Sequence, residues 1–488
     1  MLQIKRASFV IENNLNNSFL LLIVLLSVLI SVLFINYLLI GIAAIILSLL
    51  VFIYGERFLI GLIIVSLFTL VSDLGTTLRL YVHLIDFSLL GYLFIKKYGF
   101  NFSEYPKLPK PLIYFLLLYY FAMIITTIFS EHILIGIDRI SRQSVFFIIA
   151  YIFFSFLKDI RYVKIYVIAL VIVSLILALS SIFQFSAGGF KLLDFALGVR
   201  YRVTGLISNV DATTAFFILT FPLVITLSFS KTYKNKQPLF LLIIFILTIG
   251  IFLTTSRSAI MAILVSLLFI LFYLKRDLFK KLIVILVVIV LLIIFIPTLS
   301  QLTFIFRVQE GLSNRDYLWK MAFDIIKDNP VLGIGPGAYK FEMFNYFPVM
   351  LNTWIGNLFV DLYIATGGAN NAHSIFLKFT SDMGIPGLIA LFYFITLYFQ
   401  IAARTIKKAR YGNLELFLII LSISVTAGSM FIRGIFDSIG ILTYGIITDD
   451  LPFWLWFGIL IFFYQKPKEY FLEKGKTESA GGTVLLNE

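Results

Sequence analysis

Long apolar segments are the feature of this chain that most restricts its fold. They approach the ~17–25 residues that a helix needs to cross the hydrocarbon core of a bilayer. Clear candidates are 19–35, 38–54, 58–71, 111–129, 165–183, 212–229, 239–253, 259–274, 282–299, 387–403, 414–432 and 451–464. Two shorter segments, 84–95 and 145–157, fit either tilted spans or interfacial helices. The sequence therefore predicts 12 to 14 membrane spans.

Composition excludes a soluble globule. Of the 488 residues, 60% are hydrophobic and 13% are charged, against about 45–50% and about 25% in soluble domains. Leu, Ile, Val and Phe fill the apolar segments without the alternation of barrel strands. The prediction is an all-α, polytopic transmembrane helical bundle. Because the chain has no Cys, disulfides, a thiolate metal site and a cysteine nucleophile are excluded.

The basic residues indicate the orientation of the chain. With 14 alternating spans and the N-terminus inside, 25 of the 39 Lys and Arg residues fall in the short inner segments. Positive charge is enriched in cytoplasmic loops of membrane proteins, so both termini are expected in the cytoplasm. The net charge of +13 then reflects orientation in a membrane, and we expect no nucleic-acid partner.

This topology divides the chain into four parts. Residues 1–299 would hold the first eleven membrane helices with short loops, and residues 300–386 an extracytoplasmic loop acting as a lid. Residues 387–464 would hold the last three membrane helices, and 465–488 a cytoplasmic tail. Loops of such length are usually functional or disordered, so we expect the chemistry at 300–386.

The long loop contains a helix signature of its own. Ser313 followed by Asp316 is a capping-box pattern, and Tyr317, Met321 and Ile325 recur at helical spacing. Asp328-Asn329-Pro330 ends this helix. The run Gly333-Ile334-Gly335-Pro336-Gly337 is typical of a tight connector.

The sequence contains no motif typical of a metal-binding or nucleotide-binding site. The three histidines, His83, His132 and His373, are isolated on the predicted outer side, without an HExxH or a similar spacing. There is neither a Walker loop nor a long cytoplasmic segment. We therefore expect no metal, no cofactor and no nucleotide-driven pump.

Arginines at the predicted outer membrane boundary run against the positive-inside trend. They are Arg200, Arg202, Arg257, Arg315 and Arg433. The planar guanidinium suits diphosphate oxygens, while snorkelling or headgroup binding is the structural alternative for each.

A histidine among these cations would complete a site for transfer chemistry. His373 precedes a span, and histidine is the most common general acid or base in catalysis. Together with two fixed cations it would provide what a metal-free transfer from a diphosphate leaving group needs. A hydrogen-bonded structural histidine is the alternative.

Several motifs in order resemble the O-antigen ligase/polymerase superfamily. They are Arg202-Val203-Thr204-Gly205 through Asn209, Thr254-Thr255-Ser256-Arg257-Ser258-Ala259, Asn314-Arg315-Asp316-Tyr317-Leu318-Trp319, Asn329-Pro330 through Gly337, His373-Ser374, and Met383-Gly384-Ile385-Pro386-Gly387-Leu388. The resemblance covers roughly 200–400. The N-terminal spans match only as hydrophobic helices.

The resemblance implies a membrane glycosyltransferase with a GT-C-like helical fold. Such an enzyme transfers a glycan from a polyprenyl-diphosphate carrier to an acceptor at the outer face of the bacterial cytoplasmic (inner) membrane. The matching motifs imply that Arg257 and Arg315 bind the donor diphosphate and that His373 activates the acceptor. The same donor-binding role is implied less strongly for Arg200 and Arg202. The implied partners are the carrier-linked glycan, a glycan or lipid A-core acceptor, membrane lipids and a chain-length regulator.

Two sets of alternatives stay open. A polymerase, a ligase and a protein glycosyltransferase share the donor chemistry, so the sequence does not separate them. A secondary transporter or flippase of lipid-linked or small substrates is the other class. Transporters usually show repeat symmetry and ionisable residues at mid-membrane, whereas the halves of this chain are dissimilar.

Overall fold

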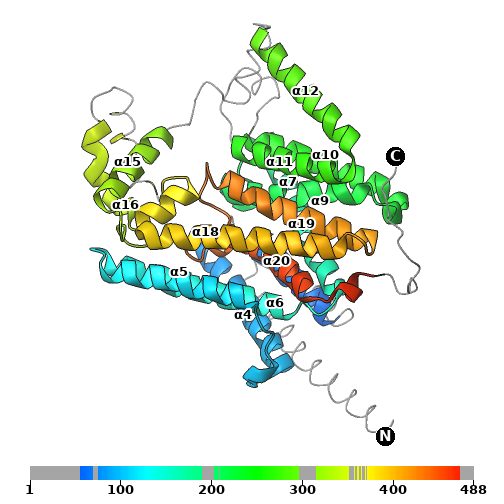
Figure 1. Ribbon diagram of the computed structural model, residues 1–488, viewed down its shortest axis with the longest axis horizontal. Helices are drawn as coiled ribbons and strands as arrows, with labels where there is room; N and C mark the ends of the chain where they lie inside the picture. The colour runs from blue at the N-terminus through cyan, green and yellow to red at the C-terminus, as the bar shows by residue number, and fades with distance from the viewer. Residues whose placement is uncertain are drawn as a thin grey trace.

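The structure of the chain is a computed structural model. It describes residues 55–69, 75–188, 203–207, 209–295, 315–350, 357, 360–361, 364, 369 and 371–472. Within these residues the chain is helical and contains no strand, which confirms the predicted all-α class. Figure 1 shows most of the long helices packed roughly along one axis.

The described chain consists of α-helices and short 3₁₀ turns. The α-helices are α3 (Glu56–Thr69), α4 (Gly75–Tyr98), α5 (Lys110–Ile128), α6 (Ile133–Ser155), α7 (Ile160–Ala187), α9 (Val210–Ser228), α10 (Gln237–Thr254), α11 (Arg257–Leu274), α12 (Arg276–Phe295), α15 (Arg315–Asp328), α16 (Tyr339–Glu342), α18 (Ile375–Ala409), α19 (Leu414–Arg433) and α20 (Ile447–Gln465). The 3₁₀ turns are η2 (Phe102–Glu104), η3 (Gly205–Ile207), η4 (Lys231–Lys236), η6 (Met343–Met350) and η7 (Lys468–Phe471).

Eight helices of the described chain are long and apolar enough to cross a membrane. They are α5, α7, α9, α10, α11, α18, α19 and α20. In α9 and in α20, 89% of the apolar stretch that could cross the membrane is buried inside the protein. In the candidate span Tyr233–Thr254, which ends with α10, only 28% is buried. Helices α9 and α20 therefore form the centre of the bundle, while α10 turns most of its surface outwards.

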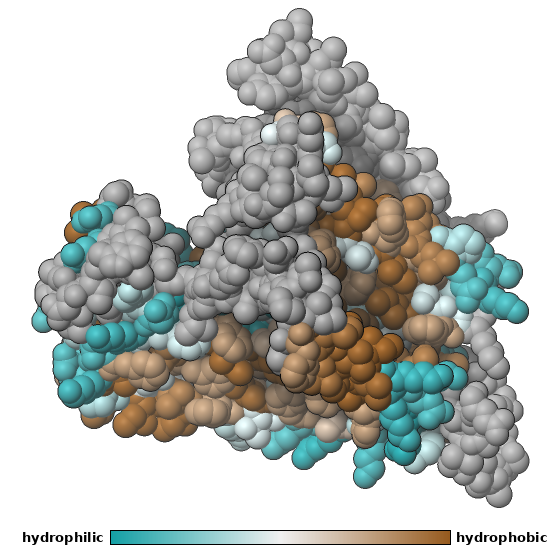
Figure 2. All heavy atoms as spheres, turned by 90° about the horizontal axis from the view of Figure 1, so that it is seen from above, coloured by the Kyte–Doolittle hydropathy of each residue, from teal (hydrophilic) through white to brown (hydrophobic). Residues whose placement is uncertain are grey.

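The distribution of apolar residues on the surface indicates that the protein lies in a membrane. Figure 2 shows apolar residues over the middle of the long axis and hydrophilic residues towards both ends, near α15 and α16 on the left and near the end of α18 on the right. Apolar side chains that face a bilayer need no protein partner. This explains why α10 and α12 leave large residues such as Phe245 and Val284 exposed.

The described helices refine the predicted spans. Segment 84–95 lies inside α4, which has 24 residues. Segment 145–157 lies mostly in α6, which has 23 residues and ends at Ser155, two residues before the end of the predicted segment. Neither helix is among the eight candidate spans. The predicted spans 19–35 and 38–54, and residues 473–488 of the predicted tail, lie outside the described residues.

Helix α18 begins earlier than predicted. The sequence placed a loop up to residue 386, whereas the helix starts at Ile375, after its N-cap Ser374. It is interrupted at Gly384, whose φ of 56° only glycine adopts without strain, just before Pro386. The backbone of Val331 would lie 2.3 Å from a Cβ at this position. The Gly-Ile-Pro motif thus breaks the helix and does not precede it.

A small group of helices with a core of its own lies at one end of the bundle. Leu318, Met321 and Ile325 of α15 pack against Tyr339 and neighbouring residues. Helix α15 confirms the helix predicted from Tyr317, Met321 and Ile325, and it ends at Asp328 as expected. Ser313, its predicted cap, lies outside the described residues.

Candidate functional site

Several helix ends meet near the α15 group. The first turn of α9 carries Asp211, which Arg433 at the end of α19 contacts, and His373 lies two residues before α18. We call this end of the bundle, defined by Asp211, His373 and Arg433, the site end. Gly250 of α10 packs against Phe217 of α9, so the turn that follows α10 lies at this end as well.

The described residues that hold a left-handed backbone without being glycine all belong to segments at the site end. They are Thr255, His373 and Tyr444, with φ of 50°, 50° and 58°. Such conformations cost free energy and concentrate at functional sites. Thr255 precedes Arg257 by two residues, and Tyr444 follows in the loop that begins after Arg433.

The backbone of His373 is fixed by Asn371. The amide oxygen of Asn371 accepts the His373 N–H at 2.8 Å and the hydroxyl of Ser438 at 2.5 Å. A backbone bond of 2.8 Å from Ile375 N to Gly434 O joins the same two segments. The start of α18 is therefore attached directly to the loop that follows α19.

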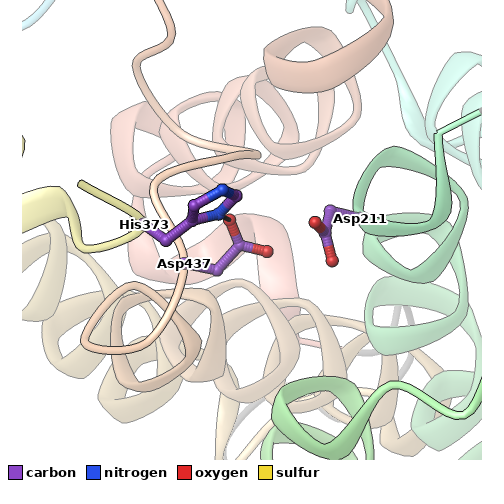
Figure 3. Close-up of side chains that lie close together, drawn as sticks. All are labelled: Asp211, His373 and Asp437. Carbon is purple, nitrogen blue, oxygen red and sulfur yellow. Dashed lines mark ion pairs between the residues drawn. The ribbon is translucent and has the colours of Figure 1, made fainter. Parts of the chain in front are cut away.

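This attachment places His373 beside Asp437. The Nδ1 atom of His373 is 3.8 Å from Oδ1 of Asp437, within ion-pair reach but longer than a hydrogen bond. Asp437 is fully buried, whereas the His373 side chain is 30% exposed. Because Nδ1 itself is buried, the exposed part of the ring lies on its other edge. Figure 3 shows the ring next to the Asp437 carboxylate, with Asp211 across from them.

Arg433 holds the two carboxylates. Its Nη2 donates to Oδ2 of Asp437 at 2.8 Å and to the backbone oxygen of Asp211 at 2.7 Å, and lies 3.6 Å from Oδ1 of Asp211. Arg433 is fully buried. Its Nε and Nη1 atoms have no hydrogen-bond partner among the described residues. We refer to Asp211, His373, Arg433 and Asp437 as the His373 cluster.

The charges around Asp437 keep it ionised. Burial alone would raise its pKa, but the charge of Arg433, followed by the interactions with His373 and Arg315, holds the pKa of Asp437 well below its usual range. Arg315, the first residue of α15, thus lies within electrostatic reach of the cluster.

The geometry also brings three potential metal ligands together. One ligand atom each from Asp211, His373 and Asp437 lies within 4.8 Å of the others. Sequence spacing did not suggest this set, because the three residues come from separate segments. However, Nη2 of Arg433 already contacts both carboxylates. The guanidinium of Arg433 therefore supplies positive charge to both carboxylates.

Helix N-termini supply further positive potential at the site end. Arg257 begins α11, and its N-cap Ser256 makes no side-chain cap. Arg315 begins α15, and Ser374 before α18 likewise makes no side-chain cap. N-terminal N–H groups and the helix dipole attract anions. The N-termini of α11 and α15, each beginning with an arginine, therefore favour the binding of anions.

The predicted site residues are only partly brought together. His373 and Arg315 both act on Asp437, and Arg257 starts a helix at the same end. Arg200 and Arg202 lie outside the described residues. The sequence did not identify the partner carboxylates, Asp211 and Asp437. A signal was present in the pair Arg433 and Asp437, which are four residues apart at the end of an apolar span.

A second buried cluster lies further along the same loop. Lys378 donates to Leu442 O at 2.8 Å and lies 4.0 Å above the Tyr444 ring. Tyr444 donates its hydroxyl to Oδ2 of Asp382 at 2.7 Å, and Asp450 accepts the N–H of Thr443 at 2.6 Å. We call Lys378, Asp382, Tyr444 and Asp450 the Lys378 cluster. Asp450 and its neighbour Asp449 are both buried in the first turn of α20.

Asp382 also holds the glycine-rich connector. Its Oδ2 accepts the N–H of Gly337 at 3.1 Å, and its backbone oxygen accepts that of Gly335 at 2.8 Å. A Cβ at Gly335 would lie 2.3 Å from the Ser130 hydroxyl, and Gly333, Gly335 and Gly337 all have positive φ. The predicted tight connector is confirmed. It fastens the α15 group to α18 and to the turn before α6.

Part of the chain matches a known protein family. Residues 242–392, from within α10 to within α18, match the family model for O-antigen ligase. The match includes Arg257, Arg315 and His373 and leaves out Asp211 and Asp437. No curated protein matches the chain significantly. The match confirms, for residues 242–392, the resemblance to the O-antigen ligase/polymerase superfamily seen in the motifs.

Proposed function

We propose, from the O-antigen ligase domain and the geometry of the His373 cluster, that this protein is a metal-independent membrane glycosyltransferase. It transfers or polymerises a glycan from a polyprenyl-diphosphate donor at the outer face of the bacterial cytoplasmic membrane. One observation carries the proposal. His373 has one edge exposed and the other beside a buried, ionised Asp437, at an end where helix N-termini and arginines favour an anion.

His373 is the acceptor base in this proposal. The exposed edge of its ring accepts the proton of an acceptor hydroxyl as the oxygen attacks the anomeric carbon of the donor sugar. The bond from that carbon to the diphosphate oxygen breaks, and the configuration inverts. Asp437 positions the ring and stabilises the positive charge that forms on it, as the carboxylate does in catalytic triads.

The diphosphate leaves with increased negative charge, which the arginines stabilise. Arg315 and Arg257 are the donor-binding residues, aided by the uncapped N-terminus of α11. Preorganised cations aimed at developing charge are among the largest contributions to catalysis. Arg200 and Arg202 are further candidates for the same role.

The position of Arg433 is an argument for a mechanism without a metal. Its guanidinium pairs with both carboxylates that could bind a divalent cation with His373. A metal would have to displace a buried arginine, which would leave that charge without its pairs. Transfer is therefore expected to persist after treatment with EDTA, and a loss that added Mg²⁺ or Mn²⁺ restores would contradict this part of the proposal.

The placement in the membrane follows the distribution of charge. The end of α18 opposite the site end carries Lys407 and Lys408 in its last turn, as expected of a cytoplasmic end. The site end would then face outwards, where carrier-linked glycans are used. We place both termini in the cytoplasm and treat the segment from residue 300 to the start of α18 at Ile375 as the outer lid, with a chain-length regulator as an expected partner.

The test is incorporation of label from a carrier-linked repeat unit by the protein in proteoliposomes. Growth of the labelled glycan on the carrier indicates a polymerase, and its appearance on added lipid A-core indicates a ligase. Arg315→Ala is expected to lower the rate by about 10²–10³-fold, as removal of a charge-stabilising donor does. Phe323→Leu, an exposed change on the same helix, is the control. Full transfer by Arg315→Ala would remove Arg315 from the donor site.

A further inference from the structure

One tryptophan of the α15 group differs from the two described tryptophans in the bundle core. Trp454 donates its indole N–H to Ile441 O at 2.8 Å, and Trp456 donates to Leu219 O at 3.2 Å. The indole N–H of Trp319 is buried and has no acceptor among the described residues. Buried Trp N–H groups usually have a partner. The described residues therefore leave this donor unsatisfied.

The position of Trp319 connects it to the proposed active site. It lies four residues after Arg315 in α15, so both side chains project from the same face of that helix. Its ring stacks against Phe436, with centroids 6.2 Å apart and planes at 29°. Phe436 immediately precedes Asp437, the partner of His373. The aromatic pair therefore borders the cluster on the side of the lid.

The two rings are partly open to the outside. Trp319 and Phe436 are both of intermediate exposure, although α15 is otherwise a polar helix with a buried face formed by Leu318, Met321 and Ile325. A lipid-facing anchor would lie on an apolar helix at the membrane boundary. Trp319 instead stacks on Phe436 in the loop of the site, and part of the residue remains exposed.

We propose that Trp319, backed by Phe436, forms a subsite for the sugar ring bonded directly to the donor diphosphate. The apolar C–H face of a pyranose packs on an aromatic ring, and its oxygens accept hydrogen bonds from donors at the ring edge. With the diphosphate at Arg315, the attached sugar lies about one helical turn away, at Trp319. The subsite positions the donor sugar and thereby contributes to specificity. This inference rests on the proposed function.

Two probes separate the sugar from the lipid diphosphate. One is a short-chain polyprenyl diphosphate, and the other is the same lipid bearing one hexose, tested as glucose, galactose and N-acetylglucosamine. Binding of each to the full-length protein in nanodiscs gives the increment contributed by the sugar. The wild type is expected to bind at least one sugar-bearing probe about tenfold more tightly, equivalent to about 1.4 kcal/mol. Trp319→Leu is expected to lose that increment while binding the bare diphosphate like the wild type.

Two further variants identify the source of the effect. Trp319→Phe keeps an aromatic face without the N–H and is expected to retain part of the increment. Phe323→Leu, one turn along α15 and exposed, is expected to retain all of it. A tryptophan that only packs the lid would lower the melting temperature or the affinity for both probes equally. That result, or a wild type without any sugar increment, would overturn the subsite.

The outcomes separate this inference from the proposed function. If Arg315→Ala weakens binding of the bare diphosphate while Trp319→Leu leaves the sugar increment intact, the donor site stands and the subsite is wrong. If the wild type binds neither probe, the proposed function is wrong and the subsite is wrong with it.

Discussion

The loop from residue 434 to residue 446 contributes Asp437 to one ionic cluster and Tyr444 to another, and the two clusters differ in their exposure. In the His373 cluster the histidine ring is 30% exposed, and Arg315 approaches from the lid. In the Lys378 cluster the charged side chains are buried throughout, with Asp382 at 1% and Lys378 at 4% exposure. Each cluster includes a residue with a left-handed backbone, His373 and Tyr444.

This difference in exposure indicates that the His373 cluster takes part in the reaction and that the Lys378 cluster stabilises the fold around it. A reacting group must be reached by substrate, as His373 can be. The Lys378 cluster cannot be reached, but it joins the glycine connector, α18 and α20 through the carboxylate of Asp382 and the N–H of Thr443. We infer that it fixes the frame in which the His373 cluster works. Variants in the two clusters should therefore change different quantities.

The largest effect on stability is expected from Arg433→Met. The change leaves the carboxylates of Asp211 and Asp437 buried without their cation, and breaking one side of such a pair costs about 3–5 kcal/mol. Thermal unfolding in detergent measures the loss. Adding Asp437→Asn should recover part of it, because one uncompensated charge is removed. A double variant no more stable than Arg433→Met would contradict the pairing.

Asp382→Asn should lower stability by a smaller amount without changing the chemistry. The charge-assisted bonds from Tyr444 and Gly337 weaken, which corresponds to about 2 kcal/mol. The folded fraction should transfer glycan at the wild-type rate, because Asp382 lies outside the proposed reaction path. Unfolding curves and transfer rates normalised to folded protein check both points. A normal melting temperature with lost transfer would reverse the roles assigned to the two clusters.

Tyr444→Phe offers a finer test within the support cluster. It removes the hydroxyl that donates to Asp382 and keeps the ring beneath Lys378. The expected loss of stability is about 1–2 kcal/mol, no larger than that of Asp382→Asn. A larger loss would mean that the hydroxyl has another role in the cluster.

The smallest expected effect is a change in thermal stability at acidic pH. The low pKa of Asp437 means that its ionised form stabilises the folded state above the ordinary aspartate value of about 3.9. This contribution is lost as the pH falls below that value towards the folded-state pKa. The difference in melting temperature between wild type and Asp437→Asn should stay constant from about pH 8 to about pH 5 and narrow below about pH 4. A difference that narrowed near neutral pH would argue against an ionised, arginine-paired Asp437.

The sequence predicted the parts of this protein that depend on local patterns. Apolar runs predicted the helices, the spacing of Tyr317, Met321 and Ile325 predicted α15, and alternate glycines predicted the connector. Arg315 and His373 stood out because charged and titratable groups are uncommon beside membrane spans.

The missing parts of the site depend on distant contacts. Asp211 and Arg433 are 222 residues apart, and a single sequence gives no measure of their proximity. Asp437 lies in Gly-Ile-Phe-Asp-Ser, which matches no motif. The start of α18 was misplaced because Gly384 and Pro386, which usually stand outside helices, interrupt this helix from within.

The most direct test of the account is single-turnover transfer by His373 variants in proteoliposomes, with Asp437→Asn for comparison. His373→Ala should bind the carrier-linked donor like the wild type and lower the transfer rate by about 10²–10⁴-fold, the usual contribution of a general base. Asp437→Asn should lower the rate less, because the base remains. Full transfer by folded His373→Ala would contradict the assignment of this cluster as the active site.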